Sequence, residues 1–163
     1  MLETAFAYGA DAVYAGQPRY SLRARNNEFG SLAALKTGID RAHQLGKAFY
    51  LVSNVFPRNA KVKSFLADLD PVVALGPDAL IMADPGLIAM VREAWPEMPI
   101  HLSVQANTVN YATVRFWARL GICRVILSRE LSLEEVAEIR EACPDVELEV
   151  FIHGALCVAY SGR

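Results

Sequence analysis

Short runs of apolar residues recur along the chain, and each is followed by a segment whose apolar residues repeat with helical spacing. The runs predict six strands, at Asp11–Gly16, Lys47–Asn54, Asp78–Ala83, Pro99–Gln105, Arg124–Ser128 and Glu147–Gly154. The other segments predict helices at Leu2–Tyr8, Ser31–Leu45, Ala60–Leu75 with a break at Pro71, Leu87–Trp95, Tyr111–Leu120 and Ser132–Ala142. Strands therefore alternate with helices along the whole chain.

This alternation is typical of α/β proteins with a parallel sheet, and repeated units of this kind favour a (β/α) barrel of the TIM type. An open, doubly wound sheet is the alternative, although the GxGxxG turn that often marks it is absent from the sequence. A complete barrel has eight strands in roughly 250 residues. We therefore expect residues 1–163 to form one incomplete barrel domain that lacks the first strand and the C-terminal part. Such a piece should be poorly stable and inactive alone.

Composition narrows the class of protein. The chain is 53% hydrophobic and 21% charged with a net charge of −2, which excludes disorder and leaves no global basic field for binding nucleic acid. Any contact with RNA must be local. Three cysteines without a CxxC pair argue against a secreted disulfide framework, and neither a signal peptide nor a membrane span is visible. We expect a soluble, cytoplasmic protein.

In a parallel barrel, functional groups come from the carboxyl ends of the strands. Polar residues follow every predicted strand here: Gln17, Arg19, Asn54, Asp84, Ser103, Gln105, Asn107, Ser128, Arg129, Glu130 and His153. The alternative for each residue is an ordinary polar loop or a helix cap, as expected for Asp84 before Pro85. The set still predicts a site at this end of the strands.

The first of these loops contains three arginines, Arg19, Arg23 and Arg25. Guanidinium groups bind carboxylates and phosphates through paired hydrogen bonds. The loop is therefore a candidate binding site for a small carboxylate or for RNA phosphate. The alternative is an ordinary solvated loop.

The last predicted strand is followed by His153 and Cys157. This pair suggests either a thiolate with its base or a metal ligand at Cys157, whereas Cys123 and Cys143 fit small buried apolar residues. The sequence has no GxSxG elbow, no HExxH helix and no P-loop. Common hydrolase and ATPase mechanisms therefore lack their motifs.

The segment ELEVFIHGALCVAYSGR, residues 147–163, resembles the signature of the collagenase-like peptidases, peptidase family U32. The segments YGADAVYAG, YSLRARNNEF, PDALIMADPGLI, IHLSVQANTVN and RVILSRELSLEEV also resemble the tRNA hydroxylation branch of that family. The resemblance implies a (β/α) barrel and formation of 5-hydroxyuridine at the tRNA wobble position, with prephenate as co-substrate. It also implies an iron-sulfur cluster, of the 4Fe–4S type, with Cys157 as its first ligand and the others beyond residue 163.

Combined with the strand-end positions, the resemblance assigns provisional roles. Glu130 and His153 are the candidates for proton transfer. The candidates for substrate binding are Arg19, Arg23, Arg25, Asn54, Ser103, Gln105, Asn107 and Arg129. The expected partners are tRNA, a small carboxylate and a homologous protein. Two alternatives remain, a collagenase-like peptidase and a noncatalytic partner subunit of a hydroxylation complex.

Overall fold

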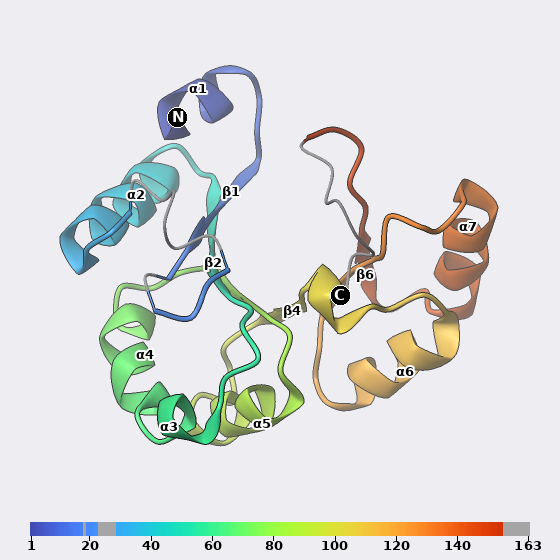
Figure 1. The fold of residues 1–163 in the computed structure, drawn as a ribbon. Coiled ribbons are helices and arrows are strands. Elements are labelled where there is room, and N and C mark those ends of the chain that lie inside the picture. The colour runs from blue at the N-terminus through green and yellow to red at the C-terminus, as the bar shows by residue number, and fades with distance from the viewer. Residues whose placement is uncertain (18, 23–28, 155–163) are drawn as a thin grey trace. The chain divides into compact units, whose positions relative to one another are not determined.

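The computed structural model describes residues 1–17, 19–22 and 29–154, and the chain divides into two compact units, Met1–Met98 and Pro99–Arg163 (Figure 1). The first unit contains α1 (Leu2–Ala7), β1 (Ala12–Gly16), α2 (Leu32–Gln44), β2 (Ala48–Ser53), α3 (Asn59–Val62), α4 (Phe65–Val73), β3 (Ala79–Met82) and α5 (Pro85–Ala94). The second contains β4 (Ile100–Leu102), a 3₁₀ turn (Val104–Ala106), α6 (Tyr111–Arg119), β5 (Arg124–Ile126), α7 (Leu133–Ala142) and β6 (Glu147–Glu149).

The first unit is a three-stranded parallel sheet with helices packed against it. Leu51 in β2 is in register with Ala15 in β1 and with Leu80 in β3, and both leucines are fully buried. Helix α2 packs against β2, where Gly38 lets Phe29 and Phe49 approach the helix backbone. Their rings meet edge to face at 5.4 Å.

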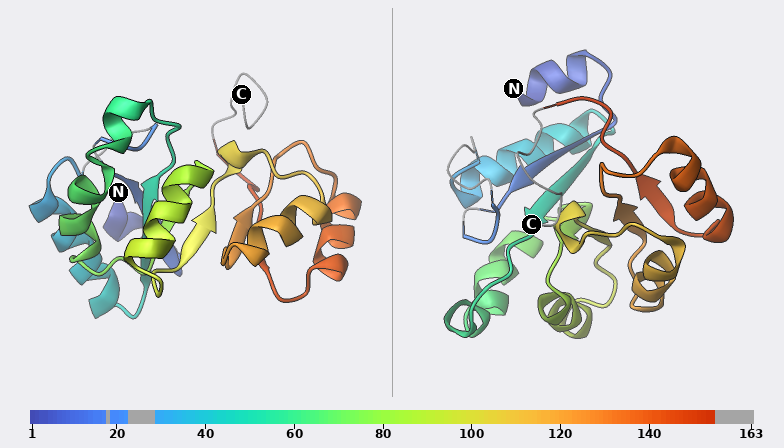
Figure 2. Two further views of the ribbon diagram at one scale, coloured as in Figure 1. Left: turned by 90° about the horizontal axis from the view of Figure 1, so that it is seen from below. Right: turned by 45° about the vertical axis from the view of Figure 1, so that its right-hand side comes forward.

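The second unit repeats the arrangement. Val125 in β5 is in register with Leu102 in β4 and Leu148 in β6, and all three strands are parallel. Helices α6 and α7 lie side by side (Figures 1 and 2). Helix α7 begins with a capping box in which Ser132 and Glu135 each bond the other's backbone N–H. The predicted alternation of parallel strands and helices is confirmed.

Two helix starts show why these boundaries lie where they do. Asp84 caps α5, because its Oδ1 accepts a hydrogen bond from Leu87 N at 2.9 Å and Pro85 occupies the first turn. Asn110 caps α6 in the same way through Thr113 N. The cap interpretation of Asp84 is therefore confirmed.

The predicted break at Pro71 is wrong. The helical segment is interrupted at Lys63–Ser64, and Pro71 lies inside α4. Pro71 has no backbone N–H, so α4 contains it with the loss of one helical hydrogen bond. The interruption frees the carbonyl of Lys61, which accepts a hydrogen bond from the hydroxyl of Tyr20 at 3.2 Å. The break therefore coincides with a contact from another part of the chain.

The last strand is also shorter than predicted. β6 ends at Glu149 instead of Gly154, and residues 150–154 are exposed. His153 therefore lies in a bend beyond the strand and not at its end. No helix in the described ranges is long and apolar enough to cross a membrane.

Candidate functional site

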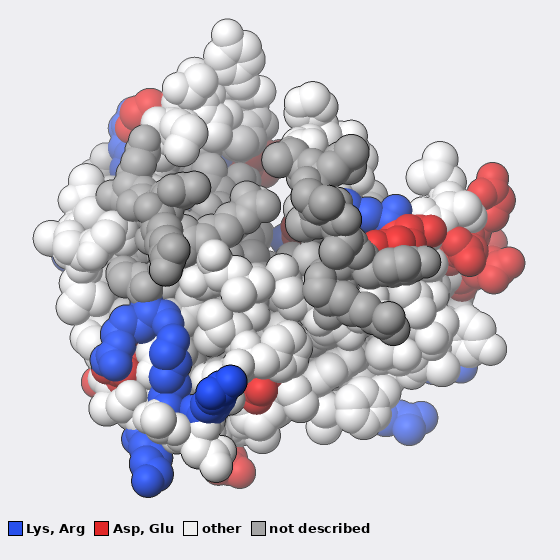
Figure 3. All heavy atoms as spheres, in the orientation of Figure 1, with Lys and Arg blue, Asp and Glu red and all other residues white. Residues whose placement is uncertain are grey.

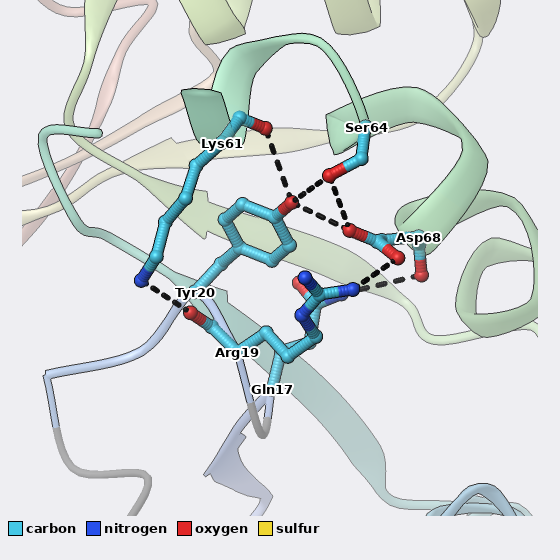
Figure 4. A network of polar contacts seen from close by, with 6 residues as sticks. All are labelled: Gln17, Arg19, Tyr20, Lys61, Ser64 and Asp68. Atoms are coloured by element: carbon cyan, nitrogen blue, oxygen red, sulfur yellow. Dashed lines mark hydrogen bonds and ion pairs between the residues drawn. The ribbon is translucent and has the colours of Figure 1, made fainter. Parts of the chain in front are cut away.

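The carboxyl ends of β1 and β2 carry a polar cluster centred on Tyr20 (Figure 4). The Tyr20 side chain is fully buried, and its hydroxyl donates to Asp68 Oδ2 at 2.7 Å. Ser64 Oγ donates to the same carboxylate oxygen at 2.9 Å, and Arg19 Nη1 bonds Asp68 Oδ1 at 2.6 Å. The loop after β1 is thereby joined to the start of α4. We call Arg19, Tyr20, Ser64 and Asp68 the Tyr20 cluster.

The electrostatics of the cluster follow from these bonds. Hydrogen bonds from Tyr20 and Ser64 and the nearby Arg19 charge hold the pKa of Asp68 below its usual value, so the carboxylate stays ionised. Burial and the hydrogen bond to Asp68 raise the pKa of Tyr20, so its hydroxyl keeps its proton. Arg19 leaves 61% of its side chain exposed while it pairs with Asp68. The cluster thus presents a fixed guanidinium to solvent.

Two buried amide side chains also connect the segments around the Tyr20 cluster. Gln17 is buried, and its Nε2 lies 3.5 Å from the carbonyl oxygen of Asp68. Asn54 is also buried, and its Oδ1 accepts a hydrogen bond from Leu22 N at 3.3 Å. The predicted substrate residue Asn54 therefore ties the loop after β2 to the loop after β1. Arg23 and Arg25 lie outside the described residues, so of the arginine loop the structure places only Arg19.

The second unit has its own polar cluster at the carboxyl ends of β4 and β5. Ser103 follows β4 directly, is buried, and hydrogen-bonds Gln105 Oε1 through its hydroxyl. Ser128 Oγ donates to Asn107 Oδ1 at 3.3 Å, which joins the loops after the two strands. Asn107 has a φ of 51°, a left-handed conformation that asparagine tolerates better than most residues. Neutral amides and hydroxyls of this kind can hydrogen-bond the edges of a nucleobase.

The remaining predicted residues of this unit are Arg129, Glu130 and His153. The Arg129 guanidinium lies over the ring of Phe151, 4.5 Å from its centroid, which is a cation–π contact. Glu130 and His153 are both exposed. Their role in proton transfer stays a prediction.

The metal-site prediction rests on Cys157, which lies outside the described residues. Within the described part of the chain, no three His, Cys, Asp or Glu side chains are grouped as metal ligands would be. Cys143 is buried as expected, with its Sγ 3.6 Å from the Tyr111 carbonyl oxygen. Cys123 is exposed, so its interpretation as a buried apolar residue is wrong. It lies directly before β5, with its Sγ 3.4 Å from the Ile100 carbonyl oxygen.

Sequence reasoning missed Tyr20, Ser64 and Asp68. Ser64 and Asp68 are spaced i, i+4 on a predicted helix, which is a signal for a side-chain pair. Tyr20 is 48 residues from Asp68, and no local pattern connects them. Only the fold brings the aromatic hydroxyl to the carboxylate.

Residues 1–163, the whole chain, match peptidase family U32. The chain belongs to peptidase family U32. One U32 relative, tRNA hydroxylation protein P of Escherichia coli strain K12, is 70% identical over 98% of this chain and 35% of its own length. A more distant relative in the same bacterium, 23S rRNA 5-hydroxycytidine C2501 synthase, is 33% identical over 98% of this chain and 23% of its own length.

The U32 fold is seen directly in a solved structure, "The Structure of the U32 Peptidase Mk0906". It covers 91% of this chain and 63% of its own chain with a TM-score of 0.74 at 21% identity, a likeness of fold. The predicted fold class, a partial (β/α) TIM-like barrel with six parallel strands alternating with helices, is confirmed. The chain spans about a third of the length of the curated relative that it matches at 70% identity.

Proposed function

We propose that the complete protein hydroxylates a nucleobase of tRNA. The observation that carries this proposal is the 70% identity over nearly the whole chain to a relative named for tRNA hydroxylation. The relative named as an rRNA hydroxycytidine synthase supports the same chemistry on a second RNA. The polar clusters at the strand ends offer cations for phosphate and amides for base edges, as RNA recognition requires.

The finer proposal is 5-hydroxyuridine at the wobble position, with prephenate as co-substrate. Arg19 supports it, because its guanidinium is fixed by Asp68 at 2.6 Å and still largely exposed. In this proposal Arg19, Arg23 and Arg25 bind the carboxylates of the co-substrate or the RNA phosphates. Replacing all three with glutamine should abolish hydroxylation, and unchanged hydroxylation would exclude this role.

An iron-sulfur cluster belongs to the proposal through the resemblance around Cys157. The described residues hold no ligand group that fits a cluster. The cluster would therefore need Cys157 together with cysteines that the resemblance places after residue 163, and would supply redox chemistry. Iron and sulfide analysis of the anaerobically purified complete protein, beside its Cys157→Ala variant, tests this. Equal iron and sulfide in both proteins would remove Cys157 as a ligand.

The function itself is tested in cells that lack the gene. Their tRNA, digested to nucleosides and analysed by mass spectrometry, should lack a uridine derivative that is one oxygen heavier than uridine, and a plasmid copy should restore it. Proteolysis, the activity in the family's name, is the contrasting outcome. Unchanged tRNA, together with gelatin cleavage by the purified complete protein, would replace this proposal with proteolysis.

A further inference from the structure

The segment after β2, residues 56–63, is unusually basic for this chain. It reads FPRNAKVK and holds Arg58, Lys61 and Lys63 with no acidic residue, although the chain as a whole has a net charge of −2. All three cationic residues are exposed. We call residues 56–63 the α3 basic segment, because helix α3 lies within it.

The positive charge of the α3 basic segment is not cancelled locally. Neither Arg58 nor Lys63 forms an ion pair with any carboxylate of residues 1–17, 19–22 or 29–154. The nearby carboxylate of Asp68 is already paired with Arg19. Lysine and arginine atoms gather over the α3 part of the surface in the space-filling view (Figure 3). The result is a local cationic surface on an acidic protein.

This surface is continuous with the Tyr20 cluster. Lys61 Nζ lies 3.4 Å from the carbonyl oxygen of Arg19 and 5.9 Å from the centre of the Tyr20 ring. The Lys61 carbonyl accepts a hydrogen bond from Tyr20, which anchors α3 to the loop after β1 (Figure 4). The exposed guanidinium of Arg19 and the cations of the α3 basic segment therefore border one another at the carboxyl ends of β1 and β2.

An aromatic side chain stands in the same segment. Phe56 leaves 56% of its surface exposed, directly before Pro57 and Arg58. Proline fixes its own φ and favours an extended backbone at the residue before it, so Phe56 is presented on a stiff segment. An exposed aromatic ring among unpaired cations is the combination that binds unstacked nucleotides, with bases on the ring and phosphates on the cations.

We propose that the α3 basic segment binds a single-stranded stretch of the RNA substrate, with Phe56 stacking on a base and Arg58 and Lys63 contacting phosphates. The inference rests on the proposed function and names the surface by which the RNA is held. A duplex offers no unstacked base to Phe56. A lipid surface is disfavoured because α3 spans only four residues and forms no amphipathic face.

The test measures binding of unfractionated tRNA to the complete protein across a range of salt concentrations. Arg58→Gln/Lys63→Gln should weaken binding and reduce the slope of log affinity against log salt by about 1.4, from about 0.7 per lost single-strand phosphate contact. Lys36→Gln/Arg119→Gln is the matched control, since it removes two exposed cations outside the segment. Its slope should equal that of the wild type.

Phe56→Ala separates stacking from charge. It should lower the affinity about tenfold at every salt concentration and leave the slope unchanged. Equal slopes in the wild type and in Arg58→Gln/Lys63→Gln, with intact binding by both, would overturn this inference and leave tRNA hydroxylation standing. A wild-type protein that binds no tRNA and leaves cellular tRNA unmodified would overturn both.

Discussion

Tyr20 is the residue through which the loop after β1 is held to α4. Its buried hydroxyl lies within hydrogen-bond distance of Asp68, Ser64 and the Lys61 carbonyl, so Tyr20→Phe removes a hydrogen bond to an ionised carboxylate. The variant should lose about 1–3 kcal/mol of unfolding free energy. Urea denaturation measures this loss, with Tyr8→Phe as control because Tyr8 is 90% exposed. Equal stability of the two variants would contradict the proposed anchoring.

His101 gives the second unit a pH-dependent stability. It is buried in β4, and burial together with the Arg124 charge lowers its pKa from 6.5 to about 4, while Glu147 opposes this shift. The unfolded chain therefore binds a proton more readily than the folded one. Stability is complete above about pH 6.5 and falls as the pH drops toward 4.

Lowering the pH from 7 to 5 should therefore reduce the free energy of unfolding by about 2 kcal/mol. Denaturant unfolding at both pH values measures it. His101→Gln should remove that part of the pH dependence, whereas His43→Gln, an exposed control, should retain it. The same pH dependence in wild type and His101→Gln would show that other groups cause the loss.

At the scale of residues, the sequence indicates candidate site residues but not the side chains to which they bond. The position of Arg19 after a strand is readable from the pattern of polar residues, and so is that of Ser103. The acid that fixes Arg19 lies 49 residues away, and the hydroxyl that binds Asn107 lies 21 residues away. These pairings depend on how parallel strands align, which local sequence does not encode.

At the scale of elements, Gly38 shows why α2 lies close to β2. Inside a helix, alanine in place of glycine normally increases stability by about 1 kcal/mol. Here the new Cβ would lie 2.5 Å from Phe29 Cε1 and 3.0 Å from Phe49 Cε2. Gly38→Ala should therefore destabilise the protein by about 1–3 kcal/mol in urea denaturation.

Part of this loss should return in Gly38→Ala/Phe29→Leu, which removes the ring that makes the shortest contact. A Gly38→Ala protein at least as stable as the wild type would contradict the close packing.

Element positions follow from the sequence because periodicity and caps act over a few residues. Every predicted strand and helix is present, and the pattern Ser132-x-x-Glu135 locates the start of α7 within one residue. Three boundaries differ from the prediction. The break before α4 coincides with the Tyr20 contact to Lys61, β4 ends at Leu102 ahead of a 3₁₀ turn instead of at Gln105, and β6 ends at Glu149, beyond which residues 150–154 are exposed.

At the scale of the whole molecule, both units have polar side chains that bond one another beyond the carboxyl ends of their parallel strands. In the first unit Arg19, in the loop after β1, bonds Asp68 of α4, and in the second Asn107 and Ser128 join the loops after β4 and β5.

The most direct test of this account measures hydroxylated uridine in the tRNA of a strain that lacks the gene and carries a plasmid copy. The wild type and the Lys36→Gln/Arg119→Gln control should restore the nucleoside to the same level. Arg58→Gln/Lys63→Gln should restore clearly less at equal protein abundance. Full restoration by that variant would contradict the role of the α3 basic segment, and no restoration by the wild type would contradict RNA hydroxylation itself.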